Sequence, residues 1–346
     1  MKKTVKQAVG IDVAQQELVI TIGKMYDDFT TEQFGYKVFK NTQAGILALV
    51  EWVKKLTDNS VSVRYVMEAT GVYHQKFAYY LDQNSYEVSI VLPNKISNYI
   101  RTLEVKTITD KTCSQAICQF GLERKLDQWH VPNNVYKVLQ QLTRERDQLV
   151  LERSVIKNQI HAEKTEAETN LNSLRRMVER IKFLNSQEKE IKIEITKIVN
   201  NEPNLRAIVD RISTLPGVGE LTAVTVLAET NGFELIRNKA QLVSYAGLDV
   251  KEKQSGTSVK GKPRISKQGN RNLRKAMHLP ALSAVKWNEN FKSIYARLVS
   301  KHGIKMKALV AIQRKQLELI YILFKNETVY DKDYEDKKNR VLAQKA

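Results

Sequence analysis

Residues 132–199 contain no glycine and no proline after the first position, and long charged side chains dominate them. Apolar residues recur at every seventh position in the first half of this stretch: Val135, Leu142, Leu149 and Ile156. This is the spacing of a helix that buries one stripe of side chains against a partner helix. We therefore expect a long helical region that separates the parts of the chain on either side of it.

The helical region is expected to contain a turn. The polar stretch "HAEKTEAETN", residues 161–170, interrupts the apolar repeat, and Leu174, Ile181 and Ile195 continue a similar spacing after it. Two antiparallel helices within one molecule would explain this pattern, and so would a coiled coil between two molecules. Both interpretations stay open, because the spacing of apolar residues does not specify the partner helix.

The segment before the helical region predicts a mixed sheet covered by helices. Residues 7–23 have the apolar pattern of two strands, and three more strands are predicted at 36–41, 63–70 and 87–93. Helical periodicity occupies residues 42–56, 73–83 and 110–126. Three early strands followed by alternating strand and helix indicate an α/β domain, in which we expect the first and fourth strands to be neighbours.

A third unit begins where the helical pattern breaks, at residues 201–203. In it, Pro216, Gly217 and Gly219 predict a tight turn before a helix rich in small residues. Such a turn presents backbone N–H groups at a helix start and resembles the helix-hairpin-helix DNA-binding turn; a plain connection between two helices is the alternative. The predicted domains are residues 1–126, 127–202 and 203–330, followed by a charged tail at 331–346 that we expect to be disordered.

The charge of the chain favours a polyanionic partner. Lys and Arg number 56 against 38 Asp and Glu, which gives a net charge of +18. Nucleic acid is the expected partner, because clustered cations gain affinity by releasing counterions from a phosphate backbone. No apolar run approaches the ~20 residues needed to span a bilayer, and no apolar segment follows the first lysines. We therefore expect a soluble, cytoplasmic and nucleoid-associated protein with no membrane partner.

Three acidic residues of the first unit are candidate metal ligands. Asp12 and Glu68 interrupt apolar strands, where an unpaired carboxylate would be costly to bury, and Asp110 begins a predicted helix. Neighbouring strands would bring these acids together, and hard oxygen ligands of this kind hold the Mg²⁺ (or Mn²⁺) ions of phosphoryl-transfer enzymes. Asp110 has an alternative role as the N-cap of its helix.

The stretch "QSG" places Ser255 beside a glycine, Gly256, that permits close backbone approach to DNA. The cations around it would bind a phosphate and stabilise the extra charge of its transition state: Lys251, Lys253, Lys260, Lys262, Arg264, Lys267, Arg271 and Arg274. Ser255 is therefore a candidate nucleophile, and an ordinary flexible loop is the alternative. Ser258 and Ser266 are rival hydroxyls; Ser266 is better interpreted as a helix cap or phosphate contact.

Seven short motifs follow one another along the chain: "GIDVAQ", "EATGVY", "TDKTCSQAICQFG", "LPGVGELTA", "YAGLD", "QSG" and "ISKQGNRNLRKA". In their order and spacing they resemble the IS110/IS1111 type of insertion-sequence transposases, the family that also includes the Piv DNA invertases. The resemblance covers residues 7–325. Any one motif would be weak evidence, whereas seven in register are specific.

The resemblance implies a RuvC-like, RNase H-type N-terminal domain with a DEDD acid set, a coiled-coil linker and a mostly helical C-terminal transposase domain. By this similarity Asp12, Glu68 and Asp110 match the first three acids, and Ser255 is the nucleophile that forms a phosphoserine intermediate with DNA. A bridge RNA encoded beside the gene would pair with donor and target DNA to choose the sites. A homodimer that assembles into a homotetramer is the implied functional form.

The chain departs from the family at the fourth acid. Cys113 stands at the position one helical turn after Asp110, where the family usually has a second aspartate. We do not expect a thiol to replace a carboxylate, because Mg²⁺ prefers oxygen ligands. Three acids with phosphate and water can still hold Mg²⁺, so the chain is either active with fewer ligands or an impaired copy. With only Cys113 and Cys118, neither a disulfide framework nor a zinc site is expected, and both are interpreted as small buried residues.

Two functions of other classes stay open. A RuvC-like nuclease would hydrolyse DNA with metal-activated water and would not need Ser255. A catalytically impaired nucleic-acid-binding protein would need the cations but neither the acids nor the serine. A site-specific DNA invertase is a closer variant within the same family. A covalent protein–DNA product distinguishes the recombinases from the other two.

Overall fold

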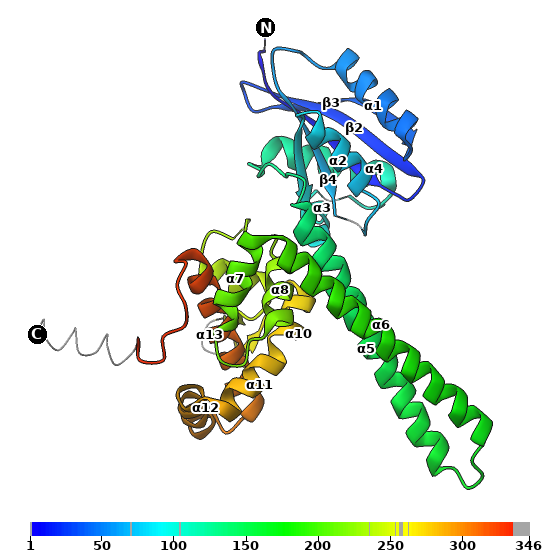
Figure 1. Cartoon of the computed structure of the whole chain (residues 1–346). Helices are drawn as coiled ribbons and strands as arrows, with labels where there is room; N and C mark the ends of the chain where they lie inside the picture. Colours follow the sequence, from blue (N-terminus) through cyan, green and yellow to red (C-terminus); the bar gives the residue numbers. More distant parts are fainter. Residues whose placement is uncertain are drawn as a thin grey trace, which may run out of the picture. The chain divides into compact units, whose positions relative to one another are not determined.

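The computed structural model describes residues 2–69, 71–103, 105–234, 236–252, 254–255, 259–261 and 263–334. The chain forms two compact units, residues 1–131 and 132–346 (Figure 1). The twelve C-terminal residues, 335–346, which belong to the tail expected to be disordered, lie outside the described residues, as do Lys253, Gly256, Ser258 and Lys262. No helix in the described ranges is long and apolar enough to cross a membrane.

The first unit is built on a five-stranded mixed sheet. Its strands are β1 (Thr4–Val13), β2 (Glu17–Tyr26), β3 (Thr31–Lys40), β4 (Val63–Glu68) and β5 (Glu87–Val91). Their spatial order is β3-β2-β1-β4-β5, in which β1, β2 and β3 pair antiparallel while β4 and β5 run parallel to β1. The prediction of a mixed α/β fold with neighbouring first and fourth strands is confirmed.

Helices cover both faces of this sheet. They are α1 (Gln43–Leu56), α2 (Gln75–Gln83), α3 (Pro93–Ile100) and α4 (Asp110–Glu123). Side chains of α1 and α2 share one buried cluster with β1 residues such as Val9 and Ile11, whereas Ala8 lies on the other face in a cluster with α4. Alternation along a strand therefore puts Gly10 and Asp12 on the α4 side. Helix α3 was not predicted; Pro93 at its first turn begins it directly after β5.

Gly10 allows α4 to lie directly on the sheet. A Cβ added at Gly10 would come within 2.2 Å of the backbone nitrogen of Cys118 and 2.3 Å of the carbonyl oxygen of Ser114, so only glycine fits there. On the same helix the Ser114 hydroxyl is hydrogen-bonded to the Thr21 hydroxyl of β2 at 2.8 Å, with both groups buried. These contacts fix the position of α4 over β1 and β2.

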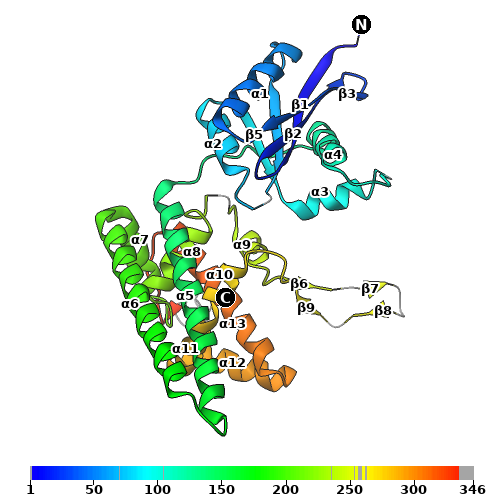
Figure 2. The same cartoon turned by 90° about the vertical axis from the view of Figure 1, so that its right-hand side faces the viewer.

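The second unit begins with a long helical hairpin. Helices α5 (Asn134–Thr165) and α6 (Leu171–Asn201) run antiparallel and pack along their lengths (Figures 1 and 2). Leu142 and Ile156 of the seven-residue repeat are buried, as are Ile191 and Ile195 opposite. Of the two interpretations left open by the sequence, the structure contains the hairpin within one molecule.

Acid is predicted to weaken this hairpin through Glu188. Burial would raise the pKa of this α6 carboxyl, but hydrogen bonds from Lys192, Arg153 and Arg146 outweigh burial and lower the pKa to about 2. Because this value lies below the ordinary 4.5, the stabilisation is complete above about pH 4.5 and is lost as the pH falls toward 2. The thermal midpoint, followed by circular dichroism, should therefore fall more steeply below about pH 5 in the wild type than in Glu188→Gln.

A matched control for the acid prediction is Glu179→Gln. Glu179 forms an exposed i,i+4 pair with Arg175 on the same helix, in which the two side chains are 57% and 68% exposed. Exposed pairs add little to stability, so this variant should keep the pH dependence of the wild type. Equal slopes for Glu188→Gln and the wild type would contradict the prediction.

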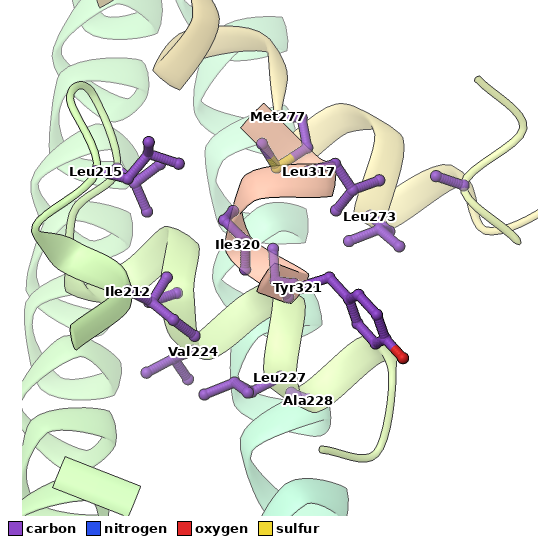
Figure 3. Close-up of a cluster of buried hydrophobic side chains, with 14 of the residues drawn as sticks. Ile212, Leu215, Val224, Leu227, Ala228, Leu273, Met277, Leu317, Ile320 and Tyr321 are labelled. Carbon is purple, nitrogen blue, oxygen red and sulfur yellow. The ribbon is translucent and has the colours of Figure 1, made fainter. Parts of the chain in front are cut away.

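The remaining helices of the second unit surround one apolar core. They are α7 (Pro203–Ser213), α8 (Glu220–Glu229), α9 (Lys239–Tyr245), α10 (Arg271–Ala276), α11 (His278–Trp287), α12 (Glu289–His302) and α13 (Lys305–Lys325). Figure 3 shows Leu317, Ile320 and Tyr321 of α13 within this core, with Val224 and Leu227 of α8 nearby. The expectation of a mostly helical C-terminal part is confirmed.

One two-stranded ribbon interrupts these helices and was not predicted. Strand β6 (Val250–Lys251) pairs antiparallel with β9 (Arg264–Ile265), and β7 (Gln254–Ser255) pairs antiparallel with β8 (Val259–Lys260). Figure 2 shows β7 and β8 farther than β6 and β9 from the helices of this unit. The ribbon therefore carries Ser255 away from the helical core.

The turn between α7 and α8 provides a stability prediction. Gly217 has φ +83°, and a Cβ there would lie 2.3 Å from the carbonyl oxygen of Pro280 in α11, whereas a Cβ on Gly219 would meet nothing within 4 Å. Gly217→Ala should lower the free energy of unfolding by about 2–4 kcal/mol, because both the backbone conformation and the close packing reject a methyl group. Gly219→Ala, at the N-cap of α8, should cost less than about 1 kcal/mol.

Urea unfolding of both variants measures this difference, and equal losses would contradict it. The turn is also held by Gln316, which donates a side-chain hydrogen bond to the Pro216 carbonyl at 2.9 Å. Packing against α11 and α13 thus accounts for the Pro-Gly sequence. The connection between two helices is present as the plainer interpretation supposed, and the DNA-binding interpretation stays a prediction.

Candidate functional site

The ends of two parallel strands bring the first two acids together. Gly10 pairs with Val66 and Ile11 pairs with Met67 in parallel register, and Asp12 and Glu68 are the next residues on β1 and β4. Carboxyl ends of parallel strands lie at the same edge of a sheet. Both side chains are partly buried at this edge.

Asp110 approaches the same edge from α4. It is the first residue of the helix, and the N-cap is Thr109, whose hydroxyl accepts a hydrogen bond from the Thr112 backbone while the Thr112 hydroxyl accepts one from the Thr109 backbone. This reciprocal capping box fixes the start of the helix. The alternative role of Asp110 as the N-cap is therefore wrong, and its exposed carboxylate is not used for capping.

The electrostatics show that the three carboxylates are close. Burial, and after it the negative charges of Asp110 and Glu68, raise the pKa of Asp12 to about 6, although a hydrogen bond from the Val13 backbone acts to lower it. Within the described ranges, no three His, Cys, Asp or Glu side chains are already arranged as a metal-binding group. The structure thus gathers the acids into one field of negative charge, without a preformed ligand cage.

The chemistry of this cluster fits a hard divalent cation. Three like charges repel one another in a partly buried place, and a cation between them would remove that repulsion. Oxygen is the ligand atom that Mg²⁺ and Mn²⁺ accept. Asp12, Glu68 and Asp110 are the residues that would hold such an ion.

Cys113 lies beside the acids but has a different character. Burial raises the pKa of its thiol, and the charges of Asp12, Glu68 and Asp110 raise it further. It packs against the apolar cluster of Val66, Ile96 and Ile117 between the sheet, α3 and α4. A protonated thiol in this setting is a poor partner for Mg²⁺. Both cysteines are free; Cys118 is fully buried, as predicted, whereas Cys113 is only partly buried, so the prediction is wrong for Cys113.

Ser255 belongs to the other unit, on strand β7. Its backbone pairs with Val259 of β8, so it lies in a ribbon rather than in an irregular loop. The candidate basic residues are distributed over this ribbon and the helix that follows: Lys251 on β6, Lys260 on β8, Arg264 on β9, Lys267 after β9, and Arg271 and Arg274 on α10. Lys253 and Lys262 lie outside the described residues. The ribbon and α10 together form a basic segment around the candidate nucleophile.

Two of the predicted contacts have structural partners. The guanidinium of Arg274 donates to the Ala246 carbonyl at 2.8 Å, which holds α10 to the end of α9. The Ser266 hydroxyl donates to the Asp249 carboxylate and accepts from the Gln268 backbone. Asn270, not Ser266, caps α10, because its side chain accepts from the Leu273 backbone at 2.9 Å. The interpretation of Ser266 as the helix cap is wrong.

A buried network around Glu229 was not predicted. This carboxylate, at the end of α8, is fully buried and receives two hydrogen bonds from Arg144 of α5, at 2.7 and 2.8 Å. Asn270 and Asn272 donate to it at 2.7 and 3.2 Å. Burial would raise the pKa of Glu229, but these hydrogen bonds and the Arg144 charge outweigh burial and lower it.

The Glu229 network joins the hairpin to the segment that follows the ribbon. Arg144 lies on α5, and Asn270 and Asn272 lie five and seven residues after the end of β9. The signal in the sequence was an acid within the apolar run "LTAVTVLAE", the same kind of signal that singled out Asp12. The network positions the base of the ribbon relative to the helical core.

Two family models match the chain. The model for DEDD-type IS110 transposases, described as a transposase, matches residues 9–163. A second model, described as the transposase IS116/IS110/IS902 family, matches residues 209–296. The first match contains the three acids, and the second contains Ser255, the ribbon and α10.

Individual relatives extend the similarity over nearly the whole chain. The pilin gene-inverting protein of Moraxella lacunata is 26% identical over 94% of this chain and 98% of its own length. The transposase for insertion sequence element IS1111A of Coxiella burnetii is 24% identical over 77% of this chain and 78% of its own length. Among solved structures, Thermus thermophilus RuvC in complex with a Holliday junction has 14% identity and a TM-score of 0.24, covering 33% of this chain and 90% of that one.

Proposed function

Because this chain is a transposase of the IS110/IS116 family with homology to the pilin gene-inverting proteins, we propose that it cuts and rejoins DNA through a phosphoserine formed on Ser255. The enzyme is a DNA recombinase. The finer proposal rests on two observations: a three-acid cluster lies on one unit, and a serine in a basic ribbon lies on the other.

In the proposed reaction the Ser255 hydroxyl oxygen attacks a phosphorus atom of the DNA backbone. A serine Oγ–phosphorus bond forms as the bond from phosphorus to one deoxyribose oxygen breaks; the serine loses a proton and the leaving oxygen gains one. The phosphodiester energy is conserved in the phosphoserine, so a hydroxyl of another strand can reverse the step and complete the exchange. Lys251, Arg264 and neighbouring cations would stabilise the added negative charge.

The acids supply the other part of the proposal. We propose that Asp12, Glu68 and Asp110 hold Mg²⁺ or Mn²⁺, which when bound would neutralise and orient the scissile phosphate. The mutual repulsion of the three carboxylates supports this assignment, because a cation removes it. Without an acid at Cys113, the cation would keep more waters or phosphate oxygens, as Mg²⁺ readily does.

Two further features rest on the resemblance to the family: the choice of donor and target DNA by a bridge RNA, and a homodimer that assembles into a homotetramer. Association with the nucleoid is proposed from the charge of the chain. The net charge of +18 supports nucleic-acid partners but does not distinguish RNA from DNA. Inversion of a DNA segment, after which the Moraxella relatives are named, is the closest alternative outcome of the same chemistry.

Covalent trapping tests the proposed function. The full chain is incubated with its flanking-region RNA, labelled donor and target DNA and Mg²⁺, and the denatured products are separated. A DNA-linked protein whose modified peptide contains Ser255 is expected, and EDTA should abolish it. Cleaved DNA without any linked protein would instead indicate a metal-dependent nuclease that uses water, and binding without cleavage would indicate an impaired copy.

A further inference from the structure

A cavity of about 730 Å³ lies within the second unit. Its walls come from α5, α8, the segment after β9, and helices α10, α11 and α13. This volume is in the range of pockets that enclose a small organic ligand. The pocket is therefore large enough for one nucleotide.

The pocket is lined by more cations than carboxylates, and two of the cations have no hydrogen-bond or ion-pair partner among the described residues. Asp147 is its one carboxylate among the lining residues described, and it pairs with Arg146 at 3.2 Å and with Lys275 at 2.9 Å. The side chains of Lys267 and Arg271 also line the pocket and have no hydrogen-bond or ion-pair partner in the part of the chain that the structure describes. Two exposed cations at the mouth of a cavity are suited to one phosphate.

The backbone conformation of Lys267 supports its assignment to phosphate binding. Its φ is +53°, a left-handed conformation that is unfavourable for a lysine. Strained residues of this kind occur where the surrounding structure must place a side chain for function. Hydrogen bonds hold the conformation, since the Lys267 backbone donates to the Gly247 carbonyl at 3.1 Å.

Part of the remaining lining is apolar and suits a base. Leu279 of α11 and Met306 of α13 line the pocket while 72% and 56% of their surface is exposed. Covering exposed aliphatic side chains with a flat ring is favourable, because apolar surface is removed from water. The paired carboxylate of Asp147 would accept a hydrogen bond from an N–H group of the base, such as the ring N3–H of thymine.

We propose that this pocket binds one unstacked nucleotide of a nucleic-acid strand, with the phosphate on Lys267 and Arg271 and the base on Leu279 and Met306. The proposal deepens the proposed function, since the strand is one that the recombinase handles. It adds a base-binding site that is separate from the proposed catalytic acids and Ser255. The pocket lies in the same unit as the ribbon, so a strand held there would be anchored within ten residues of β9.

Binding measurements without catalysis test the pocket. Fluorescence anisotropy of the full chain is measured in EDTA with a labelled oligomer of about 20 thymidines and with an abasic oligomer of equal length and charge. Leu279→Ala should weaken thymidine binding at least about threefold and leave abasic binding unchanged, because only a base covers Leu279. Arg271→Gln should weaken both oligomers by a similar factor, because it contacts the phosphate.

The chain offers a matched control for each variant. Leu282 lies on the same helix as Leu279, is 45% exposed and does not line the pocket, so Leu282→Ala should bind both oligomers like the wild type. Arg297 is an exposed arginine of α12 outside the pocket, so Arg297→Gln should weaken binding less than Arg271→Gln. A uridine oligomer distinguishes RNA from DNA. A base-dependent loss of binding in Leu279→Ala supports the pocket with either sugar, and the nucleic acid that shows the larger loss is the one the pocket binds.

The proposal is overturned if the wild type binds the thymidine and abasic oligomers equally, or if Leu279→Ala and Leu282→Ala behave alike. A second readout is photocrosslinking with 5-iodouracil, which should label a peptide that contains Leu279 or Met306; labelling confined to the ribbon overturns the proposal. If these tests fail while the Ser255 adduct forms, only the pocket is refuted. If the adduct is absent while binding is base-dependent, the proposed chemistry fails and the pocket stands.

Discussion

Asp12→Asn is expected to reduce Mg²⁺-dependent DNA cleavage by at least about a thousandfold. Asparagine keeps the shape of the side chain but removes the charge that would hold the cation between β1, β4 and α4. Metal stabilisation of a phosphoryl-transfer transition state contributes several kcal/mol, and each 1.36 kcal/mol is worth a factor of about ten in rate. Cleavage rates of labelled donor DNA with saturating RNA measure the effect.

The fold of this variant should be unharmed. Asp12 is partly buried near Glu68 and Asp110, so replacing it removes repulsion and should leave the thermal midpoint equal to that of the wild type or above it. Glu17→Gln is the matched control, because Glu17 is an exposed carboxylate at the start of β2 outside the cluster. Full activity of Asp12→Asn would refute the metal assignment, and equal losses in both variants would point to a general effect of charge.

Ser255→Ala is expected to abolish the protein–DNA adduct and to lower strand exchange by at least about 10⁴-fold. No other atom of the side chain can form the ester, and loss of a nucleophile costs rate factors of this order or more in enzymes that act through a covalent intermediate. The gel-resolved adduct and the recombinant product are measured on the same samples. DNA binding should be preserved, since the neighbouring cations are retained.

Ser266→Ala is the control for this substitution. Its hydroxyl is bonded to Asp249 at the base of the ribbon, so its loss should reduce the rate only through a less ordered ribbon and should leave an adduct. An adduct that persists in Ser255→Ala would show that another hydroxyl, such as that of Ser258, is the nucleophile. Cleavage that persists without an adduct would favour hydrolysis by water.

Much of the first unit could be predicted from the sequence because its strands carry strong local patterns. The apolar alternation located the five strands, and the order of strands and helices predicted that β1 and β4 would be neighbours. Helix α3 was missed, because eight residues directly after a strand give too short a periodicity to detect. Helices α5 and α6 were predicted, but the spacing of apolar residues could not show whether they pack on each other or on another molecule.

The ribbon around Ser255 could not be predicted for a related reason. Each of its strands is two residues long, which is below the length at which alternation is visible. Asp12 and Glu68 were found because a carboxylate inside an apolar strand is unusual enough to require a cause. Glu229 gave an equal signal in a helix, but its partner Arg144 is 85 residues away and has no local pattern that connects the two.

The Glu229 network has a consequence for how this protein can change over evolutionary time. A substitution of Arg144 alone would leave a fully buried carboxylate without its counter-charge, which typically costs about 3–5 kcal/mol. Neither residue can then drift independently, although a joint replacement by apolar residues would be tolerated. Homologous sequences should therefore show positions 144 and 229 changing together, with positions 270 and 272 following them. Such covariation would identify the joint between hairpin and ribbon in relatives whose structures are unknown.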